Sequence, residues 1–407
     1  MIYLKLVPTD FKKESRDKRE LSIARELGYE ICVIDRTKEE KGFRERYEDY
    51  DVLHISTRRL GRAAWLHAPN RVLAFLDYIV KTIQIDADII SGHDYIALLA
   101  GYIANCFKRR KAKIIYDSHE FELYRYAPNR TSLQRKIIRL VEGYLLRHVD
   151  LVLMVSDNIA DGVQKIYGLM TRPTVVRNIP AYWKLDMEKT SKIRHDFFNH
   201  LGLSEDGFLI MYHGSVAESR GIEYAVHALA ELPKDIGLVI LGGDNENGMV
   251  KKLEQMARKI GVSERVLFRP AVSVSELKDY IGAVDVEVVL QSAQVNGSFC
   301  INILYSLPNK FFESIQACVP IICCDLPEMG AIIRQYDIGL LVHEDDGKSV
   351  AEAILRLKEE KKLYARLKDN MNNAKNELCW EQESLRLKNA IRKMRGGEMY
   401  GVMSSHY

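Results

Sequence analysis

Short apolar runs alternate with longer amphipathic segments along almost the whole chain. The short runs are rich in Val, Ile and Leu, as buried strands are, whereas the longer segments repeat apolar positions with the period of a helix. A regular succession of strand and helix favours a parallel sheet covered by helices on both faces. The pattern therefore predicts an α/β protein of the doubly wound kind.

The first series of elements fills the N-terminal half of the chain. We expect strands at 2–7, 31–34, 52–55, 88–91, 113–116, 151–155 and 174–176, and helices at 15–27, 70–82, 95–106, 132–147 and 158–167. Residues 177–183 then interrupt the alternation with Pro180, so they are interpreted as a linker.

A second series follows the linker. We expect strands at 208–212, 237–241, 266–268, 284–290, 320–323 and 339–342, and helices at 222–231, 249–260, 274–281, 310–318 and 349–373. The sequence thus predicts two Rossmann-like domains, 1–183 and 184–377, facing a central cleft, with a helix at 378–395 and a tail at 396–407. Ligands of open α/β sheets bind beyond the carboxyl ends of the strands, so functional residues are expected to follow strands.

Composition supports a folded, two-domain protein. The 407 residues are 47% hydrophobic and 28% charged, which is typical of globular chains, and at about 150 residues per domain the length fits two domains. The seven cysteines are odd in number and lack zinc-site spacing, so reduced thiols are expected. No apolar run approaches the ~20 residues of a membrane span and no signal peptide is recognised, so a cytoplasmic protein is expected.

The charge is distributed unevenly. Residues 1–195 hold 35 Lys+Arg and 26 Asp+Glu, a balance of +9, whereas the rest of the chain has 24 basic and 30 acidic residues, a balance of −6. A basic half indicates an anionic partner such as nucleic acid, a membrane surface or a phosphorylated substrate, and a solvated basic face without a partner is the alternative.

Familiar nucleotide motifs are missing. The first strand continues as Val7-Pro8-Thr9-Asp10 and carries no G-x-G-x-x-G, which removes the main support for a dehydrogenase. Gly347-Lys348-Ser349 imitates the end of a P-loop, but Val342 stands where the motif needs glycine, so an NTPase is excluded.

Polar residues follow two strands of the first domain, in Ser91-Gly92-His93-Asp94 and in Tyr116-Asp117-Ser118-His119-Glu120. Histidines and carboxylates are common metal ligands, so a metal site at these adjacent strand ends is conceivable. Their spacing matches no standard metal motif, so no metal is expected. The alternative is that Asp94 and Asp117 only cap the helices that follow.

Two segments of the second domain suit an anion. Gly214, Ser215 and Arg220 lie in a loop ahead of a helix, where free backbone N–H groups and a guanidinium can bind phosphate. In the segment 306–313, Lys310 and Glu313 are one helical turn apart at a helix start, so Lys310 can bind phosphate and Glu313 vicinal hydroxyls. An ordinary turn and a surface Lys–Glu pair are the respective alternatives.

Over nearly its whole length the chain resembles the family 4 glycosyltransferases of the GT-B fold. The resemblance is carried by Glu14-Ser15-Arg16 with Arg19-Glu20, by 88–94 and 116–120, by Asn178-Ile179-Pro180, by 306–313 with 317–320, and by Trp380-Glu381. The stretch 306–313 is similar to a donor-site segment of capsule and lipopolysaccharide glycosyltransferases. Trp380-Glu381 opens a helix that crosses back to the N-terminal domain in members of the family.

The resemblance implies roles for individual residues. Glu313 matches the family's ribose ligand, Arg220 a diphosphate ligand and His119 a histidine beside the donor sugar, while Asp94 lies near the acceptor. With Glu313 and Arg220, the expected donor-binding set comprises Lys310, Gly214, Ser215, Asn309, Ser306 and Tyr305; the expected acceptor-side set comprises His93, Asp117 and Glu120. The sequence departs from the family at Tyr305, where a glutamate is usual, and at Ser215, where an arginine is usual; Lys310 is expected to supply the missing phosphate cation.

The expected function is transfer of a sugar from a nucleotide-diphosphate sugar to a hydroxyl acceptor, a glycan or lipid-linked molecule of cell-surface polysaccharide biosynthesis, with retention. No metal or other cofactor and no nucleic acid partner are expected. A UDP-sugar 2-epimerase or sugar phosphorylase of the same fold is the alternative, and a non-enzymatic nucleotide- or anion-binding module is a third.

A basic amphipathic segment suggests a membrane contact. Leu133, Ile137, Leu140 and Tyr144 share one face of the helix at 132–147, with arginines between them, and the basic run 108–113 lies nearby in sequence. Such a helix can lie on an anionic membrane surface, which would make the protein peripheral to the membrane. The alternative is that this face packs in the core of the first domain.

Overall fold

The computed structural model describes residues 1–61, 63–125, 130–244, 248–295 and 298–396. The chain forms two compact units, the first from Met1–Arg177 together with the C-terminal residues from Ser384 onward, the second from Asn178–Glu383. Residues 178–183, which we assigned to the first domain, belong to the second unit. Of the expected tail, 397–407 lies outside the described residues.

The first unit is built on an eight-stranded sheet in the order β3-β4-β2-β1-β5-β6-β7-β8. All neighbours pair in parallel except β3 with β4. The strands are β1 Ile2–Leu6, β2 Glu30–Thr37, β3 Phe43–Tyr47, β4 Tyr50–Ser56, β5 Ile89–Gly92, β6 Lys113–Asp117, β7 Leu151–Met154 and β8 Thr174–Val175. The antiparallel edge strand β3 was not expected.

Helices pack on this sheet with the periodicity that the sequence predicts. They are α1 Ser15–Glu26, α2 His67–Gln84, α3 Tyr95–Phe107, α4 Ser132–Leu146 and α5 Asp157–Tyr167. A core cluster joins α2 and α3 to the sheet, with Leu4, Leu6 and Ile90 from the strands and Tyr78 and Ala100 from the helices. Burying this apolar surface contributes about 25 cal/mol per Å² and fixes the helices to the strands.

The second unit contains a six-stranded parallel sheet in the order β11-β10-β9-β12-β15-β16 and a small antiparallel pair, β13-β14. The strands are β9 Phe208–His213, β10 Ile236–Leu241, β11 Val266–Arg269, β12 Val286–Val289, β13 Gln294–Val295, β14 Ser298–Phe299, β15 Ile321–Cys324 and β16 Gly339–Val342. β9, β10, β12 and β15 are fully buried, which explains their unbroken apolar runs.

The helices of the second unit differ from the expected set in two ways. They are α6 Met187–Leu201, α7 Ile222–Glu231, α8 Met249–Lys259, α9 Val274–Gly282, α10 Ile301–Leu304, α11 Asn309–Gln316, α12 Pro327–Tyr336, α13 Gly347–Glu359 and α14 Lys361–Glu377. α6, α10 and α12 were not expected. The prediction of a single helix at 349–373 is wrong. The backbone leaves the helical region at Glu360 (φ −81°, ψ 74°), and this residue separates α13 from α14.

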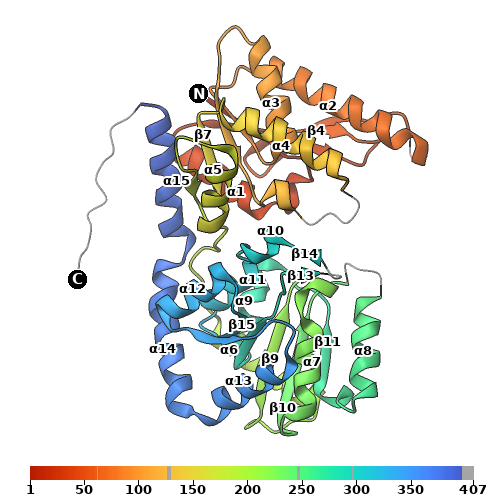
Figure 1. Ribbon diagram of the computed structural model, residues 1–407, viewed down its shortest axis with the longest axis vertical. Helices are drawn as coiled ribbons and strands as arrows, with labels where there is room; N and C mark the ends of the chain where they lie inside the picture. Colours follow the sequence, from red (N-terminus) through yellow and green to blue (C-terminus); the bar gives the residue numbers. More distant parts are fainter. Residues whose placement is uncertain (62, 126–129, 245–247, 296–297, 397–407) are drawn as a thin grey trace. The chain divides into compact units, whose positions relative to one another are not determined.

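The last helix, α15 (Trp380–Met394), begins in the second unit and continues in the first (Figure 1). At its start the Trp380 N–H donates to the Pro180 carbonyl at 2.9 Å. Further along, Lys388 pairs with Glu26 of α1 at 2.5 Å, and Leu387 and Ile391 are buried. α15 therefore returns to the N-terminal part of the chain, where it contacts α1.

In each large sheet the strands are added first on one side of the starting strand and then, after one reversal, on its other side. In the first unit the reversal lies between β1 and β5, and in the second between β9 and β12. The carboxyl ends of strands at such a switch point form the ligand-binding crevice of doubly wound sheets. This locates the candidate site of each unit.

Candidate functional site

A lysine is buried in the middle of β1. Lys5 is fully buried, and its ammonium lies 3.1 Å from Asp17 Oδ1 and 3.3 Å from Asp117 Oδ2, with Glu20 as a third carboxylate partner. Burial alone would lower the pKa of Lys5, but Asp17, Glu20 and Asp117 outweigh it and raise that pKa, so the amine stays charged. α1 supplies Asp17 and Glu20, and β6 supplies Asp117.

Arg16 completes this buried network. Its Nη2 lies 2.6 Å from Asp117 Oδ1, and its Nη1 donates to the carbonyl of Val176 at 2.7 Å. Burial would raise the pKa of Asp117, but Arg16 and Lys5 outweigh it and hold that pKa well below its usual range. The ionised carboxylate of Asp117 is therefore a fixed feature of the first unit.

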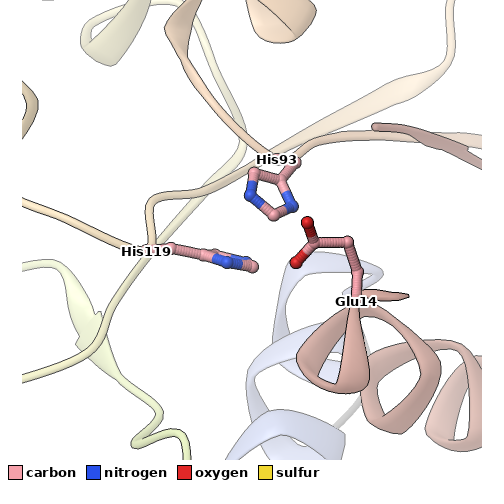
Figure 2. Close-up of side chains that lie close together, drawn as sticks. All are labelled: Glu14, His93 and His119. Atoms are coloured by element: carbon pink, nitrogen blue, oxygen red, sulfur yellow. The ribbon is translucent and has the colours of Figure 1, made fainter. Parts of the chain in front are cut away.

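Two histidines lie on this network. His93 follows β5, and its Nδ1 lies 2.8 Å from Asp17 Oδ2; His119 follows β6, and its Nε2 lies 2.9 Å from Asp117 Oδ2. The two ring centroids are 3.6 Å apart, and Figure 2 shows both rings beside the carboxylate of Glu14. Burial lowers the pKa of His119 to about 4, so its imidazole is neutral at physiological pH. Burial also acts on His93, but the Asp17 contact outweighs it and raises the pKa of His93.

Two other expected residues of the first unit are engaged elsewhere. The Asp94 carboxylate accepts a hydrogen bond from the Ala97 N–H at 2.8 Å and caps α3, as the alternative interpretation held. Glu120 pairs with Arg125 at 2.8 Å. The structure thus brings together His93, Asp117 and His119, whereas Asp94 contacts Ala97 and Glu120 contacts Arg125.

In the second unit a histidine lies between two carboxylates. His213, the last residue of β9, contacts Glu287 Oε1 with Nδ1 at 2.8 Å and Glu313 Oε2 with Nε2 at 2.9 Å. Burial opposes its charge, but Glu287 and Glu313 outweigh burial and raise the pKa of His213 to about 9. The charged imidazole therefore holds the carboxylate of Glu313 in place.

Lys310, in the first turn of α11, is buried rather than a surface residue. Its Nζ lies 3.6 Å from the ring centroid of Tyr212, and a Cβ added at Gly214 would lie 3.6 Å from the same Nζ. Burial and the nearby Arg220 lower the pKa of Lys310 well below its usual value. Among the described residues no carboxylate lies within ion-pair distance of this amine, so the alternative of a Lys310–Glu313 surface pair is wrong.

The other expected donor residues make contacts within the second unit. Arg220 Nη1 lies 3.5 Å from Gln291 Oε1, and the Gln291 amide donates to Ser306 Oγ at 2.6 Å. Asn309 Oδ1 accepts from the amide of Asn178 at 2.8 Å. The backbone carbonyl of Ser215 accepts a hydrogen bond from the Tyr212 hydroxyl at 2.5 Å, and Tyr305 is the C-cap residue of α10.

Comparison with known proteins identifies the chain. The family profile described as Glycosyltransferase Family 4 matches residues 23–179, and that described as Glycosyl transferases group 1 matches residues 193–374. The chain belongs to the family 4 glycosyltransferases. The two profiles follow each other along the chain and match the first and second units respectively.

Curated relatives of this glycosyltransferase are distant. The D-inositol 3-phosphate glycosyltransferase of Xylanimonas cellulosilytica is 29% identical over 184 residues, which are 45% of this chain and 41% of that protein. An uncharacterised glycosyltransferase of Methanocaldococcus jannaschii is 22% identical over 272 residues, 66% of each chain. Among the curated relatives, the match covers between 34% and 66% of the relative's own length.

Solved structures show that this glycosyltransferase has the GT-B fold. Anabaena HepE in complex with UDP superposes with a TM-score of 0.74 at 16% identity, over 97% of this chain and 100% of that chain. Sucrose-phosphate synthase of Thermosynechococcus elongatus superposes with a TM-score of 0.73 at 17% identity, with the same coverage. A search of the described residues for a helix both long and apolar enough to cross a bilayer finds none.

Proposed function

We propose that the protein transfers a sugar from a nucleotide-diphosphate sugar to a hydroxyl acceptor, and that the second unit binds the nucleotide. The observation that carries this proposal is Lys310, a buried amine near Arg220 whose Nζ lies 3.6 Å from the ring centroid of Tyr212. The charged form of a buried amine without a carboxylate partner is costly unless an anion joins it, which agrees with the lowered pKa of Lys310. A diphosphate supplies that anion, and UDP is bound in the Anabaena HepE structure of the same fold.

The chemistry follows from the leaving group. The barrier to transfer is departure of a nucleotide diphosphate, so cations and helix N–H groups directed at its developing charge contribute most. Lys310, Arg220 and the start of α11 provide both kinds of group, and no metal or other cofactor is required. We propose that transfer proceeds with retention, as the resemblance implies.

Glu313 is proposed to bind the ribose hydroxyls of the nucleotide. The contact with His213 orients its carboxylate and leaves further lone pairs free to accept hydrogen bonds. In the first unit, His119 is proposed to act in turnover at the donor sugar, supported by the buried carboxylates that position it. His93 and Asp117 support that ring, and Asp94 is proposed near the acceptor.

The acceptor is proposed to be a glycan or lipid-linked molecule at a membrane, reached by docking of α4. Leu133 and Leu140 are 65% and 74% exposed on this helix, with Ile137 and Tyr144 on the same stripe, so the alternative that the stripe packs in the core is wrong. Arg135, Lys136 and Arg139 are exposed between them. Of the run 108–113, however, Lys108 is buried, and Lys113 pairs with Asp150 at 2.7 Å. α4 is therefore the proposed contact.

Removing the buried amine tests the function. Lys310→Ala is expected to weaken binding of UDP and related nucleotide diphosphates by roughly 2 to 5 kcal/mol, or about 30- to 4,000-fold, because a charge pair in a desolvated site is lost. Isothermal titration calorimetry measures the affinity. Lys375→Ala is the matched control, since Lys375 is a buried lysine whose Nζ lies 4.5 Å from the ring centroid of Tyr182.

An affinity of Lys310→Ala within twofold of the wild-type value would contradict the donor assignment. Incubation of the wild-type protein with a panel of nucleotide sugars, with and without acceptor glycans, separates transfer from epimerisation. Only transfer requires an acceptor, and a binding module consumes neither substrate.

A further inference from the structure

We propose that Glu14, His93 and His119 form a binding site for Zn²⁺ or a chemically similar divalent ion in the first unit. Each of these side chains offers one ligand atom, and the three atoms lie within 4.8 Å of one another. They come from segments far apart in the sequence, ahead of α1, after β5 and after β6, so no spacing motif could have indicated them. Figure 2 shows the Glu14 carboxylate directed between the two rings.

The geometry requires only a small closure. Imidazole and carboxylate ligands bind zinc at about 2.0 to 2.2 Å, which places neighbouring ligand atoms of a tetrahedral site roughly 3.5 Å apart. Glu14 is at the partly exposed N-cap position of α1, and its carboxylate makes no capping hydrogen bond to that helix. Its side chain is therefore able to move toward the rings, and three protein ligands leave the fourth position open.

The second nitrogen of each ring supports this assignment. Nδ1 of His93 lies 2.8 Å from Asp17 Oδ2, and Nε2 of His119 lies 2.9 Å from Asp117 Oδ2, so each ring is held at one nitrogen by a carboxylate and has a second nitrogen besides. Metal-binding histidines almost always donate their other N–H to a carboxylate or carbonyl, which fixes the ring and strengthens the ligand. Both rings have that arrangement, and both carboxylates are buried.

The local charge also favours a cation here. The network below the rings contains the carboxylates of Asp17, Glu20 and Asp117 against the cations Lys5 and Arg16. Glu14 adds a further negative charge, and its carboxylate accepts a hydrogen bond from the hydroxyl of Thr9 at 2.6 Å. A divalent ion bound by Glu14 would therefore lie beside a cluster in which the carboxylates outnumber the Lys and Arg side chains.

A second group of ligand types, Asp17, Asp117 and His119, is less suitable. Its two carboxylates already neutralise Lys5 and Arg16, at 3.1 and 2.6 Å. An ion between them would have to displace a buried ammonium or guanidinium, which leaves an uncompensated buried charge. We therefore assign the ion to Glu14 and the two rings.

Binding of the ion would regulate the enzyme. This part rests on the proposed function, in which His119 acts in turnover. An ion bound by His119 occupies this partly exposed ring, so Zn²⁺ is expected to inhibit transfer and a chelator to restore it. Donor binding in the second unit is expected to be unaffected, because the proposed nucleotide ligands contain none of the three residues.

Direct metal binding tests the site without any substrate. The chelator-treated full chain is titrated with Co²⁺, whose visible absorption reports a nitrogen–oxygen site, and with Zn²⁺ in competition. One equivalent is expected to bind. Glu14→Gln, on the partly exposed surface, and His93→Gln are each expected to weaken binding by at least about tenfold, with unchanged melting temperature for Glu14→Gln. His195→Ala is the control, since His195 is an exposed histidine paired with Glu205 in the second unit.

Absence of a cobalt band, or equal affinity in wild type and Glu14→Gln, would overturn the site. Zn²⁺ that binds without slowing transfer would overturn the inhibitory role. UDP affinity and transfer measured in the presence of EDTA decide the proposed function separately, so the two failures remain distinguishable.

Discussion

At the scale of single residues, histidines with opposite charge states lie at the strand ends of the two units. His119 is neutral because burial lowers its pKa to about 4, whereas His213 is charged because two carboxylates outweigh burial. The same residue type thus serves as a neutral ligand or hydrogen-bonding group in one unit and as a cation that orients Glu313 in the other.

The charge of His213 predicts a pH dependence of stability. Its pKa is about 9 in the folded protein against about 6.5 for an unperturbed histidine, so the folded state binds the proton more tightly. The resulting stabilisation, up to about 3 kcal/mol, is fully present below pH 6.5 and is lost as the pH rises through 9. Other titratable side chains act on this group of residues, since Lys310 opposes the burial that raises the pKa of Glu287, and Arg220 adds to the burial that lowers the pKa of Lys310.

Histidine NMR checks this prediction, with His213→Gln used to assign the signal. A midpoint near 9 is expected, and Glu287→Gln should shift it toward 6.5. Urea unfolding of the wild-type protein should show the stability falling across the same window. A His213 signal that titrates at or below pH 6.5 would contradict the electrostatic account.

A second residue-scale prediction concerns the loop that carries Arg220. Gly221 has φ +67°, and an added Cβ would lie 2.0 Å from the carbonyl oxygen of Leu290, so Gly221→Ala combines strain with a backbone clash. Gly202→Ala has the strain alone, since φ is +61° and nothing lies within 4 Å. We expect about 1 kcal/mol loss for Gly202→Ala and at least about 3 kcal/mol for Gly221→Ala. Chemical denaturation measures both, and equal losses would show that the close approach is relieved at no cost.

Most of the site residues that the structure brings together could be predicted from the sequence. Their hydrogen-bond and ion-pair partners could not. His93, Asp117 and His119 were found because polar residues directly follow apolar strands. His213 lay in a segment that was singled out for its glycine and arginine, and Glu287 was hidden within an apolar strand. Lys5 interrupts the run Ile-Tyr-Leu-Lys-Leu, which was an available signal for a buried charge. Its partners come from α1 and β6, a pairing that only the tertiary fold creates.

At the scale of secondary-structure elements, α4 predicts reversible attachment to anionic membranes. Each basic residue near such a surface contributes about 1 kcal/mol, so Arg135→Gln/Lys136→Gln/Arg139→Gln should weaken attachment about 100-fold. Leu133→Ser/Leu140→Ser removes the inserted apolar side chains and should also release the protein. Co-sedimentation with vesicles of anionic or neutral lipid is the measurement.

The matched control for α4 is Val72→Ser/Leu76→Ser on α2, where the same kind of side chain is exposed. It should leave attachment unchanged. Equal pelleting on neutral and anionic vesicles, or pelleting that 0.5 M salt does not reverse, would remove the membrane claim and leave the transferase claim intact.

Helices and strands with a strong hydrophobic period could be predicted from the sequence. Several elements that were predicted wrongly or missed have a local cause. β3 has the sequence Phe-Arg-Glu-Arg-Tyr and lies at a sheet edge, where charged residues are favoured and apolar alternation is weak. α13 and α14 share a helical period, and only the backbone at Glu360 separates them. α12 begins with Pro327 in its first turn, a start signal that the sequence contained and that our interpretation missed.

At the scale of the whole molecule, the chain divides its expected chemistry between two units. The nucleotide-binding residues that we propose all belong to Asn178–Glu383, and His119 belongs to the unit that contains Met1–Arg177. The architecture could be predicted from the sequence because each unit repeats the same alternation of buried strand and amphipathic helix. The position of the boundary could not, because residues 178–183 carry no element and are assigned by contacts such as that of Pro180 with Trp380.

This division predicts that affinity and turnover respond to different units. His119→Ala should lower kcat by about 100-fold or more, the range for loss of a positioned catalytic histidine, and leave UDP affinity within twofold of wild type. Lys310→Ala should weaken UDP binding directly. Steady-state kinetics with saturating donor, UDP titrations and melting temperatures of both variants, all in EDTA, separate the effects. If His119→Ala lost UDP affinity in parallel with kcat, or if its only defect were a collapsed melting temperature, the ring would be a structural member of the Lys5 network and not a participant in transfer.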